Sequence, residues 1–74
     1  MRKLHIMFST FSERLKELRT DKNLTFDQLA RKIGTDGSTV SKWEKGFRQP
    51  TLPWVIKLAQ YFGVTLGYLA GLEE

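Results

Sequence analysis

Two adjoining stretches decide the fold of this chain: TFDQLARKIG at residues 25–34 and TDGSTVSKWEKG at residues 35–46. Each has the apolar spacing of a short amphipathic helix, and a tight turn at Gly34 joins them. The second helix has an outer face of small polar and basic side chains. A helix that enters the major groove of DNA needs such a face, because it must approach base edges and meet phosphates. On spacing alone, an ordinary helical hairpin with a solvated face is equally open.

An ordered set of further positions extends this pattern over nearly the whole chain, from about Phe11 to Leu72. The positions are Leu24-Thr25, Leu29-Ala30, Gly34, Ser38 to Glu44, Gly46, Arg48, Pro50, Leu58-Ala59, Phe62 to Val64 and Tyr68-Leu69. Together they resemble the helix-turn-helix domain of phage repressors and their bacterial relatives, the Cro/CI or XRE-like family. The resemblance implies a lambda-repressor-like domain that binds double-stranded DNA and regulates transcription.

The composition limits the class of protein. The chain has 74 residues and no cysteine, so it holds one small domain that neither disulfides nor a Cys-based zinc site can stabilise. Its single histidine has no cysteines or clustered carboxylates beside it, so we expect no metal site and no cofactor. Dimerisation is the remaining means of stabilising so small a chain. We expect no membrane span and no signal peptide, and therefore a cytoplasmic protein.

The charge distribution points to a polyanionic partner. The chain carries 12 Lys and Arg against 8 Asp and Glu, a formal net charge of +4. The excess lies on the segment proposed to contact DNA. Between residues 31 and 48 there are five cations against two acids: Arg31, Lys32, Lys42, Lys45 and Arg48 against Asp36 and Glu44.

Caps and apolar periodicity predict an all-α, compact five-helix bundle. The first helix opens at a capping box, Thr10 to Glu13, and ends near residues 21–23. The other helices run from the capping box Thr25–Gln28 to Gly34, from Asp36 to Gly46, from about Thr51 to Gly63, and from about Thr65 to Ala70. Within them we expect Trp43 to be buried in the third helix, and Leu66 and Leu69 in the fifth.

The expected domain spans residues 10–72 and is preceded by a tail at residues 1–9. The alternation of Leu4, Ile6 and Phe8 allows a short strand that pairs with a second subunit. A flexible basic arm and a packed tail are equally open.

The resemblance assigns base contacts to the start and outer face of the third helix. The positions are Gly37, Ser38, Ser41 and Lys42, with Lys45 and Arg48 in a region that resembles the family's backbone-contacting loop. Ser41 can exchange a hydrogen bond with a base, and Lys42 can donate to guanine O6 or N7 or reach a phosphate. For any one serine or lysine, a solvated surface position is the alternative.

Three residues depart from the family pattern. Relatives usually present a side chain at the position of Gly37, so either one base pair goes unread or the backbone approaches DNA more closely. Phe26 replaces a glutamine that grips a phosphate in relatives, and we expect it to pack beside the turn or to face a partner. Phe47 is unusually apolar for its loop, where it can pack on a sugar or cover the core.

Two further features concern the assembly of the domain. Arg19 and Glu44 match family positions that form an ion pair between the first and third helices. The alternative is two exposed charges that contribute almost nothing. Tyr61, Tyr68 and Leu72 exceed what one small core needs, and we consider them candidates for a two-fold interface.

These observations predict a sequence-specific, double-stranded DNA-binding transcriptional regulator, a repressor that binds a pseudo-palindromic operator as a homodimer. An enzyme finds no support, because the sequence has no cysteine nucleophile, no nearby His–Ser–Asp set and no phosphate-binding Gly-rich loop. We therefore expect no small-molecule substrate. The alternative is an antitoxin-like or adaptor protein that uses the fold chiefly to bind a protein partner. Gly37, Phe26 and the apolar N-terminal tail favour that alternative.

Overall fold

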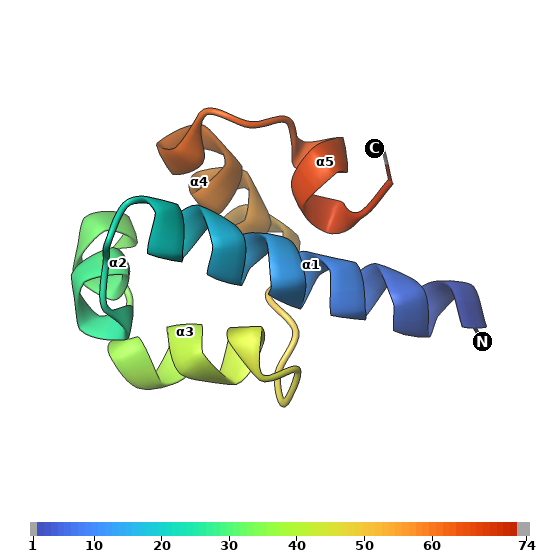
Figure 1. Ribbon diagram of the computed structural model, residues 1–74, viewed down its shortest axis with the longest axis horizontal. Coiled ribbons are helices and arrows are strands. Elements are labelled where there is room, and N and C mark those ends of the chain that lie inside the picture. Colours follow the sequence, from blue (N-terminus) through green and yellow to red (C-terminus); the bar gives the residue numbers. More distant parts are fainter. Residues whose placement is uncertain (1, 73–74) are drawn as a thin grey trace.

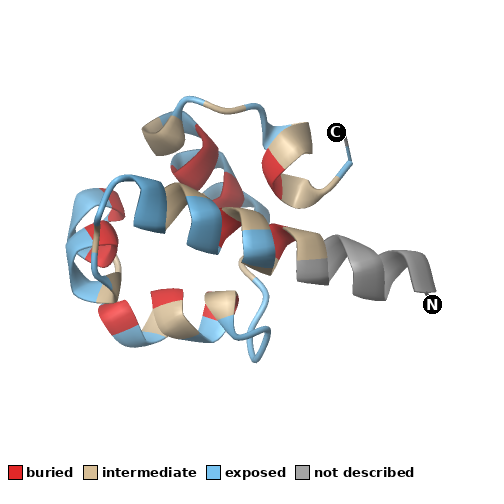
Figure 2. Ribbon diagram, viewed as in Figure 1, coloured by how far each residue is buried: buried red, intermediate tan, exposed pale blue. Residues whose placement is uncertain are grey.

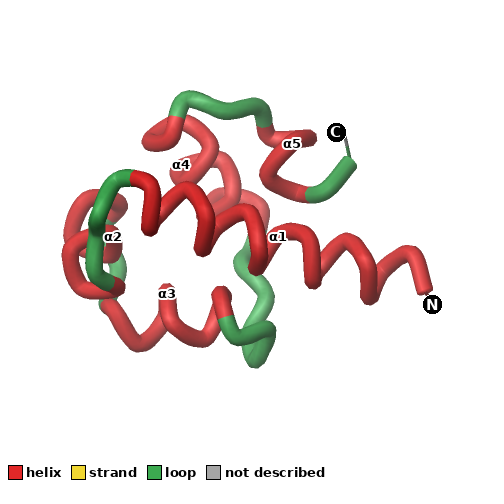
Figure 3. The backbone as a smooth tube through the Cα atoms, viewed as in Figure 1, coloured by secondary structure: helices red, strands yellow, loops and turns green. Residues whose placement is uncertain are grey.

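The computed structural model describes the backbone of residues 2–72 and the side chains of residues 10–72. Within this range the chain forms five α-helices and no strand (Figures 1 and 3). They are α1 (Arg2–Asp21), α2 (Phe26–Ile33), α3 (Gly37–Glu44), α4 (Leu52–Phe62) and α5 (Leu66–Ala70). The predicted all-α fold is confirmed. No helix within the described residues is long and apolar enough to cross a bilayer.

The first helix is longer than the sequence pattern predicts. Because α1 begins at Arg2, the predicted start at the capping box of Thr10 is wrong, and so is a strand from Leu4 to Phe8. The sequence holds neither proline nor glycine before Gly34, so nothing interrupts helix propagation upstream of Thr10. The expected boundary between residues 9 and 10 therefore falls inside a helix.

The turn between α2 and α3 follows local capping rules. The Thr25 hydroxyl accepts a hydrogen bond from the Gln28 backbone N–H at 3.1 Å, and the Gln28 side chain accepts the Thr25 N–H at 2.8 Å. This confirms the predicted capping box at the start of α2. Gly34 ends α2 at φ 90°, a left-handed conformation in which glycine avoids the steric cost of a Cβ.

The core lies where the five helices converge, and their buried residues face it (Figure 2). The largest fully buried side chains are Trp43, Leu15, Leu29, Leu58, Leu69 and Val40. The Trp43 ring lies against Trp54 of α4, with the two ring centroids 5.8 Å apart. The inward placement of Trp43 is confirmed, and α3 is thereby anchored on its inner side.

Near the end of the chain, the predicted burial is half right. Leu69 is buried, but Leu66, the first residue of α5, is 39% exposed. Tyr61 and Tyr68 are half-buried and lie beside cations. The Lys22 Nζ lies 5.5 Å from the Tyr61 ring centroid, and the Arg14 guanidinium lies 4.1 Å from that of Tyr68.

Candidate nucleic-acid interface

The outer face of α3 and the loop that follows it bring together five of the six predicted DNA-contacting residues. Ser38, Lys42, Lys45 and Arg48 are exposed and Ser41 is half-buried at the edge of the face. Figure 1 shows α3 at the margin of the bundle, with α1 on its inner side. Positions three and four apart share a helix face, so the three residues of α3 and Lys45 form one continuous strip.

Gly37 does not lie on this strip. It is buried against α2, and the prediction that it lies on the outer face is wrong. Gly37 is three positions before the buried Val40 and four before Ser41, so it lies between the inner side and the strip, and the start of α2 covers it. A Cβ at residue 37 would lie 1.9 Å from Asp27 Oδ1, closer than van der Waals contact permits. Glycine at this position therefore allows α2 and α3 to approach closely.

The N-terminus of α3 is capped by Asp36. The Asp36 carboxylate accepts the Thr39 backbone N–H at 2.8 Å and the Thr39 hydroxyl at 3.0 Å. These hydrogen bonds hold the pKa of Asp36 below its ordinary value, and the positive charges of Lys42 and Arg48 act in the same direction. The cap fixes the start of the helix that carries the strip.

The loop after α3 folds back on its last turn. The backbone N–H groups of Phe47 and Arg48 donate to the Lys42 carbonyl at 2.9 and 3.3 Å, and Gly46 adopts φ 77°. This arrangement keeps Arg48 close to the end of α3. Phe47 is 78% exposed, so it does not cover the core. Packing against a sugar remains a prediction.

The predicted ion pair between α1 and α3 is confirmed. Arg19 Nε lies 2.6 Å from Glu44 Oε2, and a second guanidinium nitrogen donates to Glu44 Oε1 at 3.0 Å. The remaining nitrogen donates to the Leu24 carbonyl at 2.7 Å. The two side chains are only 12% and 4% exposed. This bidentate geometry fixes the end of α3 relative to α1 and to the loop before α2.

Phe26 lies beside this pair rather than toward a partner. The Arg19 guanidinium lies 4.4 Å from the Phe26 ring centroid, a cation–π arrangement. Of the two placements considered, the one beside the turn is confirmed. Ser12, which the sequence reasoning did not single out, donates from its hydroxyl to the Trp43 carbonyl at 2.7 Å. Ser12 therefore connects α1 directly to α3, and Phe26 packs against the arginine of α1 that binds Glu44.

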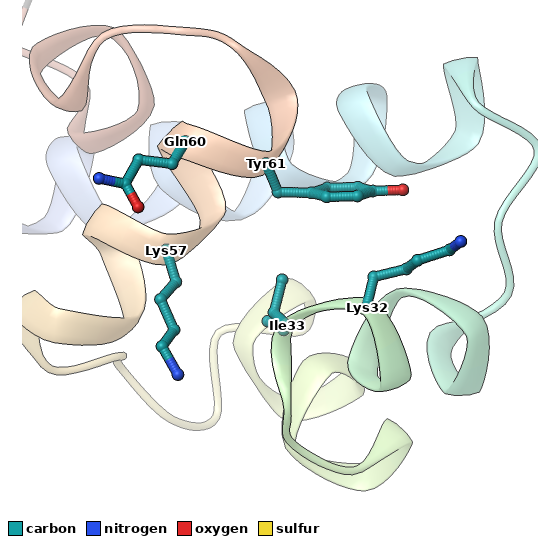
Figure 4. A pocket seen from close by; sticks show the side chains of 5 residues that line it. All are labelled: Lys32, Ile33, Lys57, Gln60 and Tyr61. Atoms are coloured by element: carbon teal, nitrogen blue, oxygen red, sulfur yellow. The ribbon is translucent and has the colours of Figure 1, made fainter.

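A separate hollow of about 420 Å³ lies between α2 and α4. Figure 4 shows its lining: Lys32 and Ile33 from α2, and Lys57, Gln60 and Tyr61 from α4. None of these residues belongs to the α3 strip. Lys57 lies over the Trp54 ring at 4.9 Å, and Lys32 is exposed. Among the described side chains, no three His, Cys, Asp or Glu residues gather as metal ligands would.

Comparison with known proteins identifies the fold as a familiar one. Residues 15–69 match the family model described as helix-turn-helix. The chain is 39% identical over 64 residues to the HTH-type transcriptional activator BcrR of Enterococcus faecalis, and 34% identical over 64 residues to the cryptic phage CTXphi transcriptional repressor RstR of Vibrio cholerae. Each match covers 86% of this chain, which spans 31% of BcrR and 58% of RstR.

Three solved structures share this fold over most of the chain. The restriction-modification controller protein C.AhdI of Aeromonas hydrophila superposes with a TM-score of 0.76 at 37% identity, over 84% of this chain and 94% of that protein. Apo-HppE superposes with a TM-score of 0.74 at 30% identity, but the match covers only 34% of its chain. A cobalt(II) HppE structure with bound substrate matches similarly. The family match, the relatives and the fold of C.AhdI agree: this chain belongs to the helix-turn-helix family of Cro/CI (XRE-like) transcriptional regulators.

Proposed function

We propose that this protein is a cytoplasmic, sequence-specific regulator that places α3 in the major groove of double-stranded DNA. The observation that carries the proposal is the strip formed by Ser38, Ser41, Lys42 and Lys45, together with Arg48. It is polar or basic along its length, and it lies on a helix fixed at both ends by Asp36 and by the Arg19–Glu44 pair. A rigid, slim, cationic helix fits direct readout of base edges.

We further propose that the protein acts as a repressor, by occupying a promoter and excluding polymerase. The repressor RstR supports this sense of regulation, whereas the activator BcrR is a relative of the opposite sense. A reporter gene under a promoter that contains the selected site distinguishes the two. Repression lowers reporter output in cells that express the protein, and a rise in output contradicts it.

The proposed assembly is a homodimer on a pseudo-palindromic operator. Leu66 and Leu72 support an interface at the end of the chain, because both are exposed apolar side chains. Tyr61 and Tyr68 support it less well, since Lys22 and Arg14 already lie against their rings. Two α3 helices about 34 Å apart would match one turn of DNA.

The adaptor alternative loses two of the features that favoured it. Phe26 packs on Arg19 and Gly37 packs on Asp27, so both departures from the family pattern have contacts inside the domain.

The test of the proposed function is selection of bound sequences from random duplex DNA at fixed salt. A two-fold symmetric consensus supports the proposal. Recovery of sequences without a consensus contradicts it, and stoichiometric co-purification of a protein partner from its own cells would then favour the adaptor.

A further inference from the structure

The space in which a side chain of residue 37 would begin is occupied by another residue. A Cβ on Gly37 would lie 1.9 Å from Asp27 Oδ1, 3.0 Å from Asp27 Cγ and 3.1 Å from the Asp27 backbone nitrogen. The Asp27 carboxylate thus lies directly against the first residue of α3. In Figure 1 the loop after α1 brings the start of α2 down beside the start of α3, which explains this contact.

The Asp27 carboxylate is available for an external partner. Asp27 is exposed, and no described residue donates a hydrogen bond to its carboxylate or forms an ion pair with it. It lies in the first turn of α2, where the helix dipole favours a negative charge. The Asp27 carboxylate is therefore an exposed hydrogen-bond acceptor at the N-terminal end of α3.

A carboxylate at this place would favour some bases over others, because it can pair only with hydrogen-bond donors on the base edges of the major groove. An ionised carboxylate only accepts hydrogen bonds. Cytosine offers the N4 amino group as a donor, whereas guanine offers only the acceptors O6 and N7 there. Adenine offers the N6 amino group beside the acceptor N7, so a carboxylate that meets its edge meets one favourable group and one unfavourable group.

We propose that Asp27 is a specificity-determining residue that replaces the missing side chain of Gly37 at the start of α3. This inference rests on the proposed function, in which this end of α3 enters the major groove. There Asp27 accepts a hydrogen bond from cytosine N4 and disfavours guanine at one position in each half-site. Lys42, Lys45 and Arg48 keep the surrounding surface positive. One carboxylate can therefore change the base preference at one position without preventing the protein from binding DNA.

The experiment compares the DNA sites selected by the wild type, Asp27→Ala and Asp27→Asn from the same random library at fixed salt. The wild type should select cytosine at one position per half-site. Asp27→Ala should lose that preference and keep the others. Asp27→Asn should shift it to adenine, because an amide can pair with both N6 and N7. In competition binding, the wild-type preference for cytosine over guanine should be roughly 5- to 150-fold and should fall to near unity in Asp27→Ala.

Two further variants control for charge and for packing. Glu17→Gln removes one negative charge from an exposed side chain of α1 and should leave the consensus unchanged. Gly37→Ala places a methyl group where the carboxylate lies, so it should remove the same base preference as Asp27→Ala. In the Asp27→Ala background it should change the consensus no further. Circular dichroism confirms that each variant is folded before selection.

The outcomes separate this proposal from the function on which it rests. A wild-type consensus that Asp27→Ala and Asp27→Asn both reproduce unchanged overturns the role of Asp27 and leaves DNA reading by α3 intact. A uniform loss of affinity on all sequences, with no change at one base, shows a merely structural role and also overturns it. Absence of any consensus for the wild type overturns both.

Discussion

At the scale of single residues, the guanidinium of Arg19 joins more segments than any local pattern suggests. It holds Glu44 at the end of α3, the Leu24 carbonyl before α2 and the Phe26 ring in α2. A largely buried pair of this kind is costly to break from one side, because the remaining charge stays in a poorly solvated site. The orientation of α3 therefore depends on one side chain of α1.

Removing Glu44 tests this dependence. We expect Glu44→Ala to lower the free energy of unfolding by about 3 kcal/mol, since Arg19 keeps its charge and loses its main partner. The double variant Arg19→Met/Glu44→Met should recover much of that loss, because it leaves no unpaired charge. Urea denaturation measures the free energy of unfolding of the single and the double variant. A double variant no more stable than Glu44→Ala would contradict the assignment.

The cap at Asp36 makes a second residue-scale prediction, on pH. The pKa of Asp36 is lowered in the folded protein, so the folded state binds fewer protons than the unfolded state as the group titrates. Its stabilising contribution is therefore complete above the ordinary pKa of aspartate and is lost as the pH falls through the lowered value. Asp36→Asn, which retains a cap, lacks this dependence.

The measurement is the free energy of unfolding of wild type and Asp36→Asn at several pH values. The difference between them should be constant above about pH 5 and should shrink toward more acid pH. A difference that does not change with pH would show that the Asp36 carboxylate does not cap α3.

At the scale of helices, α3 is attached to the domain by its inner side. Trp43 is fully buried against Trp54, and its carbonyl accepts the Ser12 hydroxyl. Trp43→Ala should lower the free energy of unfolding by about 3–5 kcal/mol, most of the stability that a domain of this size has. Thermal melting followed by circular dichroism tests this. A melting temperature within a few degrees of wild type would contradict the anchoring role of Trp43.

The loop after α3 makes a prediction about salt. If Arg48 contacts a phosphate, Arg48→Ala should weaken binding to specific and random DNA alike. It should also make the slope of log affinity against log salt shallower by about 0.9 for each phosphate that the variant no longer neutralises. Lys16→Ala is the control, because Lys16 is an exposed cation of α1 outside the segment proposed to contact DNA. Equal slopes for wild type and Arg48→Ala would remove Arg48 from the phosphate contacts.

The sequence alone predicts elements whose ends are decided locally. The Thr25–Gln28 box and Gly34 determine α2 within a few residues, so the turn to α3 was predictable. The box at Thr10 has the same pattern but lies inside α1, because such a pattern does not by itself show that the helix starts there. Periodicity placed Gly37 on the outer face, because its burial and the position of the Asp27 carboxylate both depend on how two helices cross, and no local pattern specifies that.

At the scale of the whole molecule, the exposed apolar side chains at the end of the chain predict self-association. Leu66→Glu and Leu72→Glu should each weaken the dimer, because a charge would replace apolar surface in the interface. Phe47→Glu is the control for the free protein, since Phe47 is also an exposed apolar side chain but lies in the loop after α3. Analytical ultracentrifugation at several protein concentrations measures the oligomeric state. A wild type that is monomeric both free and on DNA would contradict the dimer.

The contact between Gly37 and Asp27 also constrains how this protein can change over evolutionary time. A mutation that adds a side chain at residue 37 must displace the Asp27 carboxylate, so it fits best after a smaller residue has replaced aspartate at position 27. The reverse order is open, because a smaller residue at 27 leaves glycine at 37 undisturbed. In descendants of this chain the two positions should therefore covary, with aspartate at 27 found together with glycine at 37. New base preferences would then arise by an ordered pair of substitutions rather than by one.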